Sequence, residues 1–117
     1  MAAHLDIKRI YDPPEEADGY RVLVDRLWPR GVRKADAELH AWMKDVAPST
    51  DLRVWWQHDP ARFEEFADRY RDELDGSTAL AVLRAVCATK PQVTLLYAAQ
   101  DPLVNHALVL RELLTEP

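Results

Sequence analysis

The sequence predicts an α/β fold, a single layered domain in which a small, mainly parallel sheet is flanked by helices. Two observations carry this prediction. Short apolar segments typical of strands alternate with segments whose apolar residues recur every three to four positions, as in amphipathic helices. One strand-like segment, 93–98 (VTLLYA), is apolar throughout, which is typical of a central strand covered on both faces. The length of 117 residues fits one domain, so we expect residues 1–117 to fold as a single unit.

The first third of the chain is predicted to supply two strands. Residues 4–10 (HLDIKRI) alternate apolar and polar side chains, as a half-buried strand does, and residues 20–27 (YRVLVDRL) are rich in Val and Leu. The loop between them, 11–19, is too short for an ordinary helical crossover. We expect the second strand to run parallel to the 93–98 strand, whereas the direction of the first strand stays open.

Five later segments show the apolar periodicity of helices. They are 36–47, a short segment capped by Ser49, a helix opened by Asp59-Pro60 and stopped at Gly76, a helix between Ser77 and Pro91, and a final helix from Asp101-Pro102 to Leu114. An acid before a first-turn proline is a helix-start signal, so Asp59 and Asp101 are expected to be N-caps. Trp55 and Trp56 cannot share one helix face, so we expect one of them to pack inward.

Composition and charge exclude some classes of protein. The chain is 48% hydrophobic and 30% charged, as in soluble globular proteins, and it has neither a membrane-length apolar stretch nor a signal-peptide pattern at its amino terminus. Its one cysteine, Cys87, fits a reducing compartment and is expected to be a buried hydrophobe. We therefore predict a cytoplasmic protein without a membrane partner. The net charge of −5 argues against a protein that coats nucleic acid.

The charge is unevenly distributed along the chain. Residues 26–34 contain four bases and no acid, whereas residues 59–75 contain seven acids and three arginines. The sequence therefore predicts a basic end and an acidic flank.

Two polar stretches are predicted to reach the edge of the sheet where ligands bind in open α/β folds, the carboxyl ends of the strands. The first is VDRLWPRGVRK (24–34), and the second is 97–106, which follows the last strand. If the two strands are neighbours, these stretches share one cleft. Guanidinium groups bind phosphate or carboxylate bidentately, so the basic residues are the candidate anion ligands: Arg26, Arg30 and Lys34. The candidates for acid–base chemistry are Asp25, Asp101 and His106.

The sequence leaves a structural alternative open for each of these residues. Asp25 and Arg26 can pair with neighbouring charges, Trp28 can be a packing plug over the sheet edge, and Asp101 can serve only as a helix cap. The basic residues of 30–34 can form a solvated surface. No HxH, HExxH or paired-cysteine spacing indicates a metal site, so we predict none, and the sequence identifies no cofactor.

Several long motifs extend over nearly the whole chain. They are GYRVLVDRLWPRG (19–31), Lys34, APS with LR (47–53), His58-Asp59-Pro60, the helix with Phe66 and Tyr70, TLLYAAQD (94–101) and Asn105-His106-Ala107. These motifs resemble the YeaO-like family, domain of unknown function 488. The resemblance implies a compact bacterial-type α/β domain and no particular reaction, substrate or cofactor. It implies a site formed by the family's polar signature positions: Asp25, Arg26, Arg30, Lys34, Arg53, His58, Asp101, Asn105 and His106.

Two functional hypotheses follow. The first is a small enzyme or ligand binder for an anionic small molecule that contains phosphate or a nucleotide, with hydrolysis or group transfer as the reaction if it is catalytic. In this hypothesis Trp28, Arg53, His58 and Asn105 also contribute to the ligand site. The alternative is a nucleic-acid-binding or protein-interaction module that uses the basic loop 26–34. The sequence does not decide the oligomeric state.

Overall fold

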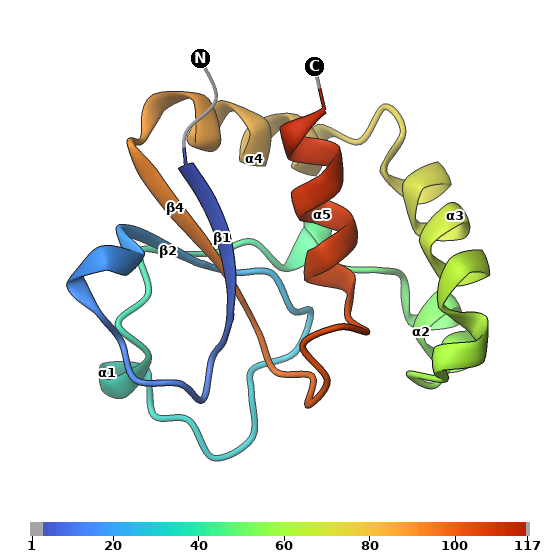
Figure 1. Cartoon of the computed structure of the whole chain (residues 1–117), viewed down its shortest axis with the longest axis horizontal. Helices are drawn as coiled ribbons and strands as arrows, with labels where there is room; N and C mark the ends of the chain where they lie inside the picture. Colours follow the sequence, from blue (N-terminus) through green and yellow to red (C-terminus); the bar gives the residue numbers. More distant parts are fainter. Residues whose placement is uncertain (1–3, 117) are drawn as a thin grey trace.

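A computed structural model describes residues 4–116 and shows an α/β fold built on a four-stranded parallel sheet (Figure 1). The strands are β1 (His4–Arg9), β2 (Tyr20–Leu23), β3 (Ala41–Trp42) and β4 (Gln92–Tyr97). Over the described residues their order is β1-β4-β2-β3, and each neighbouring pair is parallel. The predicted fold class, the central place of the last strand and its parallel pairing with the second strand are confirmed. The first strand, whose direction was open, is also parallel.

The helices follow the strands in the order that the sequence predicts, with one exception described below. They are α1 (Lys34–Ala37), α2 (Thr50–Trp56), α3 (Phe63–Leu74), α4 (Thr78–Thr89) and α5 (His106–Thr115), with short 3₁₀ helices η1 (Glu16–Asp18), η2 (Lys44–Val46) and η3 (Pro60–Arg62). Two predicted caps, Ser49 and Asp59, are confirmed, and Ser77 is a third cap. Ser49 Oγ accepts from Leu52 N at 3.1 Å, Ser77 Oγ accepts from Leu80 N at 3.2 Å, and Asp59 Oδ1 accepts from Ala61 N at 2.9 Å.

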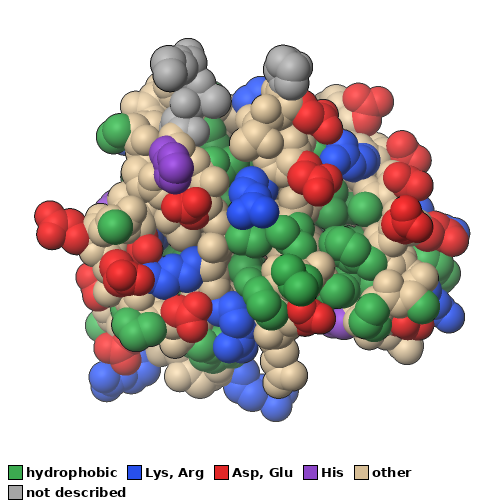
Figure 2. Space-filling view, viewed as in Figure 1, with side chains coloured by type: hydrophobic (Ala, Val, Ile, Leu, Met, Phe, Trp, Pro, Cys, Tyr) green, Lys and Arg blue, Asp and Glu red, His purple; other side chains and the backbone are tan. Residues whose placement is uncertain are grey.

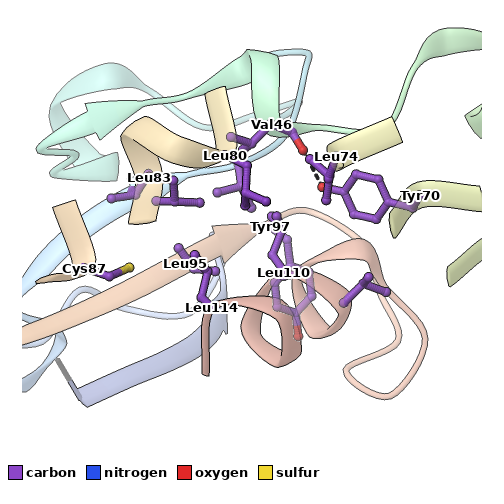
Figure 3. Close-up of a cluster of buried hydrophobic side chains, with 14 of the residues drawn as sticks. Val46, Tyr70, Leu74, Leu80, Leu83, Cys87, Leu95, Tyr97, Leu110 and Leu114 are labelled. Carbon is purple, nitrogen blue, oxygen red and sulfur yellow. Dashed lines mark hydrogen bonds between the residues drawn. The ribbon is translucent and has the colours of Figure 1, made fainter. Parts of the chain in front are cut away.

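The main apolar core lies between one face of the sheet and helices α2 to α5 (Figures 1 and 3). Alternate strand residues point to opposite faces, so Leu95 enters this core while Leu96 joins a smaller cluster on the other face. Within the main core the buried Tyr70 hydroxyl donates a hydrogen bond to the Val46 carbonyl (Figure 3). The smaller cluster is covered by α1 and by Trp28 and Val32 of the loop after β2.

A buried ion cluster holds the short link between β1 and β2. Lys8 Nζ lies 3.1 Å from each carboxylate oxygen of Asp18, and Arg21 Nη1 donates to the same carboxylate. Arg21 Nη2 also donates to the Ala37 carbonyl at 2.7 Å. We call Lys8, Asp18 and Arg21 the buried ion cluster. The link passes so close to β4 that only glycine fits at position 19, where a Cβ would lie 2.5 Å from the Gln92 carbonyl oxygen.

The predicted helix over 36–47 is wrong. The segment instead contains α1, β3 and η2, and the chain leaves α1 through Glu38 in the left-handed region at φ 47°. The apolar residues that would form one helical stripe lie on both faces of the sheet, because Leu39 packs in the smaller cluster while Met43 and Val46 pack in the main core. The free edge of β2 supplies the competing backbone bonds, including Met43 N to the Leu23 carbonyl at 2.9 Å.

The predicted start of the last helix is also wrong. Asn105 is the N-cap of α5, since its Oδ1 accepts from Leu108 N at 3.0 Å and its Nδ2 donates to the Asp101 carbonyl at 3.0 Å. Asp101 instead closes a local turn, with Oδ1 accepting from Leu103 N at 2.8 Å. His106 is therefore the first residue of the helix rather than a residue of its second turn. Among residues 4–116 no helix is long and apolar enough to cross a membrane.

Candidate functional site

A cleft of about 730 Å³ opens at the carboxyl ends of β2 and β4. Its walls come from residues 25–30 after β2, residues 98–101 after β4, the 47–48 segment, the end of α2 and the start of α5. This is the edge at which parallel sheets place their ligands. In Figure 1 the loops that follow β2 and β4 lie in the lower part of the view.

Eight of the ten predicted site residues line this cleft. They are Asp25, Arg26, Trp28, Arg30, Arg53, His58, Asp101 and His106. The structure does not bring Lys34 and Asn105 into it. Lys34 is exposed on α1, beyond the turn at Gly31. Asn105 is fully buried, and its amide is used within the protein, since Oδ1 caps α5 and Nδ2 donates to the Asp101 carbonyl.

Tyr11 and Trp56 also line the cleft, although the sequence did not indicate them as site residues. Tyr11 follows β1 and donates its hydroxyl to the Arg30 carbonyl at 2.9 Å. The signal that could have found Tyr11 is the direction of the first strand, because a parallel β1 ends at the same edge as β2 and β4.

Half-buried Asp25 and buried His106 form a pair at the base of the cleft. Asp25 Oδ2 accepts from Ala98 N at 3.0 Å and so ties the end of β2 to the end of β4. His106 Nε2 lies 3.1 Å from Asp25 Oδ1 and 3.0 Å from the Val24 carbonyl oxygen. A carbonyl oxygen can only accept, so Nε2 carries a hydrogen that points at Val24. Asp25 Oδ1 is buried and has no aligned hydrogen-bond donor in the described part of the chain.

The arginines of the cleft differ in how far their guanidinium groups are engaged. Arg26 donates to the Ala47 carbonyl at 3.1 Å and to the Pro48 carbonyl at 3.3 Å, which fixes the opposite wall. Within residues 4–116 the side chains of Arg30 and Arg53 make neither a hydrogen bond nor an ion pair. In the described part of the chain, the guanidinium groups of these two cleft-lining residues thus have no protein acceptor.

His58 enters the cleft from a turn of unusual backbone conformation after α2. Gln57 and His58 are both left-handed, at φ 51° and 55°, a region that costs free energy for residues other than glycine. The imidazole packs on the indole of Trp56 with a centroid distance of 4.6 Å. Partial burial, with the positive charges of His106 and Arg53, lowers the pKa of His58. The ring is therefore favoured in its neutral form near pH 7.

Two tryptophans stabilise the loop after β2. Trp28 Nε1 donates to the Val32 carbonyl at 2.7 Å, and Trp42 Nε1 donates to the Asp25 carbonyl at 2.7 Å. Their rings meet edge to face at 5.4 Å. Trp28 thus packs over the sheet edge, as the structural alternative predicts, and it also lines the cleft.

The basic end and the acidic flank are visible on the surface. In Figure 2 basic side chains lie at the lower end of the view, where the strand-end loops meet, and acidic side chains gather along the α3 side. Arg33 belongs to the basic stretch but pairs with Asp36 at 2.8 Å outside the cleft. No group of three or more His, Cys, Asp or Glu residues placed to hold a metal ion occurs in residues 4–116.

Comparison with known proteins gives one family and several relatives. Residues 4–117 match the family model described as the inactive DUF488-N3 subclade. An uncharacterised protein of Mycobacterium tuberculosis is 48% identical over 108 residues, which cover 92% of this chain and 91% of that protein. The uncharacterised protein YeaO of Escherichia coli is 43% identical over 109 residues, which cover 93% of this chain and 95% of YeaO. No solved structure matches the chain.

Proposed function

This protein belongs to the DUF488 family, in the subclade described as inactive DUF488-N3, and we propose that it binds a small phosphate-bearing anion in the cleft without transforming it. One observation carries the proposal: Arg30 and Arg53 line the cleft, and neither guanidinium has an acceptor within the described residues. A guanidinium is always charged and matches phosphate oxygens bidentately, so an anionic ligand supplies the acceptors that the protein does not.

The surroundings of the predicted catalytic residues favour binding over reaction. The Nε2 hydrogen of His106 is directed at the Val24 carbonyl, and Asp25 Oδ2 accepts from Ala98 N, so both side chains already make structural contacts. Asp101 is exposed and makes neither a hydrogen bond nor an ion pair with these two residues in the described part of the chain. The description of the subclade as inactive supports the same proposal. The catalytic roles of Asp25, Asp101 and His106 stay predictions.

The experiment compares two arginines of the same basic stretch. Inorganic phosphate, pyrophosphate and ribose 5-phosphate are titrated against the wild type, Arg30→Ala and Arg33→Ala, and the shift in melting temperature is measured. Ligand that binds only the folded state raises the melting temperature, so we expect a shift in the wild type and in Arg33→Ala, and its loss in Arg30→Ala. Equal shifts in the two variants, or no shift with any anion in the wild type, would contradict the proposal.

The nucleic-acid alternative is less well supported by the contacts of the basic stretch. Arg26 is engaged by backbone carbonyls and Arg33 by Asp36, which leaves Arg30 and Lys34 to face phosphates. Binding of a short oligonucleotide, measured at low and at high salt, tests this alternative, because binding through phosphates weakens steeply as salt rises.

For the protein as a whole we propose one domain in the cytoplasm, which the match over residues 4–117 and the single, buried Cys87 support.

A further inference from the structure

The size of the cleft indicates a ligand larger than a simple anion. Its volume of about 730 Å³ lies in the range of small-molecule sites, which hold about 300–1,000 Å³. If each of the five non-hydrogen atoms of inorganic phosphate takes about 30 Å³, the volume of a water-sized group, the ion fills roughly a fifth of this space. Most of the cleft is therefore left for the rest of the ligand.

An aromatic stack ends at the wall of the cleft. Phe66 lies on the indole of Trp56 at 3.8 Å with an angle of 18° between the planes, and His58 lies at 4.6 Å from the same indole. Phe66 and His58 both pack against the indole of Trp56, which is only 1% exposed. His58 is itself exposed and lines the cleft. The ring surface that Trp56 does not cover is thus available to a planar group of a ligand.

The charges of the cleft are mixed. Alongside its arginines it contains Asp101, whose Oδ1 accepts from Leu103 N while Oδ2 has no donor in the described part of the chain. A carboxylate near the anion site repels a bare phosphate but accepts hydrogen bonds from hydroxyl or amino groups. The preferred ligand therefore has hydroxyl or amino donors as well as an anion.

From the volume, the stack and the mixed charges we infer that the ligand is a nucleoside monophosphate, with its base stacked on His58, its phosphate on Arg30 and its sugar hydroxyls toward Asp101. This inference rests on the proposed function and names the ligand of the same cleft. A sugar phosphate satisfies the arginine and the aspartate but leaves the imidazole uncovered. The base is thus the part of the ligand that distinguishes the two compounds.

The test measures the dissociation constants of AMP and ribose 5-phosphate by calorimetry. Stacking of a base on an aromatic side chain stabilises the complex. We therefore expect AMP to bind at least about tenfold more tightly than ribose 5-phosphate to the wild type. His58→Asn removes the ring at a position whose left-handed backbone asparagine tolerates. In this variant the preference for AMP is expected to fall to about twofold or less, while ribose 5-phosphate is unaffected.

His4→Asn is the matched control, because it makes the same substitution at the start of β1, at the other end of the sheet from the cleft. It is expected to keep the preference for AMP. Equal affinities for the two ligands in the wild type, or a full preference for AMP in His58→Asn, would overturn the inference. If both compounds bind equally and Arg30→Ala abolishes both, the inference fails while the proposed function stands. If neither compound nor inorganic phosphate binds, the proposed function fails with it.

Discussion

The buried ion cluster and the cleft both contain arginines and aspartates, but they differ in how completely these groups are satisfied. In the cluster Arg21 is 3% exposed, and its guanidinium donates to the Asp18 carboxylate and to the Ala37 carbonyl. Asp18 also accepts from Lys8. In the cleft the guanidinium of Arg30 has no acceptor within residues 4–116. Burial of a charge is tolerated only with partners, so the cluster is complete as it stands.

Arg26 lies between these extremes. It is half-buried at the cleft wall and donates to two backbone carbonyls, yet it has no carboxylate partner in the described residues. Arg21, Arg26 and Arg30 form a series in which the guanidinium makes fewer hydrogen bonds within the described part of the protein at each step. The donors that are not used in this way are left for a ligand. Each step of the series predicts a different loss of stability on mutation.

Breaking the buried ion cluster is expected to have the largest effect. Asp18→Asn removes the charge that Lys8 and Arg21 share, and loss of one partner from a buried pair costs about 3–5 kcal/mol in the free energy of unfolding. Urea unfolding measures the loss. The control, Asp36→Asn, breaks the exposed pair with Arg33 and is expected to cost less than about 1 kcal/mol. Similar losses in both variants would show that the cluster is not a buried network.

The cluster also predicts an acid dependence of stability. Hydrogen bonds from the Glu15 backbone, Lys8 and Arg21 outweigh desolvation and lower the pKa of Asp18 below its ordinary value of 3.8. The folded state thus binds the proton less well than the unfolded state. The contribution is present above about pH 3.8 and is lost as the pH falls through the lower folded pKa. The stability difference between wild type and Asp18→Asn is expected to shrink over this window, and a constant difference would contradict the assignment.

Removing the half-engaged arginine is expected to have an intermediate effect. Arg26→Ala loses two hydrogen bonds from a charged donor to backbone carbonyls, for which we expect a cost of about 1.5–3 kcal/mol. The same urea unfolding measures it. Arg30→Ala breaks no such bond within the described residues and is expected to change stability by less than about 0.5 kcal/mol. If Arg30→Ala were as destabilising as Arg26→Ala, its guanidinium would have a structural role and the anion site would lose its main support.

The features that the sequence could predict are those that depend on local signals. Strand 93–98 and the capped helices were predictable because periodicity and cap residues are local signals. The meeting of the two polar stretches in one cleft follows from the rule for strand ends, because the second and last strands are neighbours. These predictions needed no knowledge of which side chains pair.

The remaining features depend on contacts between distant segments. The apolar spacing of 39–46 fits a helix as well as an edge strand followed by a turn, and only the free edge of β2 decides between them. The cap of α5 is Asn105 rather than Asp101, because the Asn105 side chain satisfies both Leu108 N and the Asp101 carbonyl. The pairing of Asp18 with Arg21 was hidden in a segment predicted to be an ordinary loop and strand.

The smallest expected effect concerns His58, which the cleft keeps partly exposed. Its pKa is lowered from 6.5 by partial burial and the positive charges of His106 and Arg53, so the unfolded state binds the proton better than the folded state. The stabilising contribution is therefore present above about pH 6.5 and is lost as the pH falls through the lower folded pKa. Solvent screens an exposed ring, so the change is expected to be small. Urea unfolding at pH 7.5 and pH 5 should show a weaker loss of stability on acidification in His58→Asn than in the wild type, whereas an equal loss would mean that His58 titrates as it does in the unfolded chain.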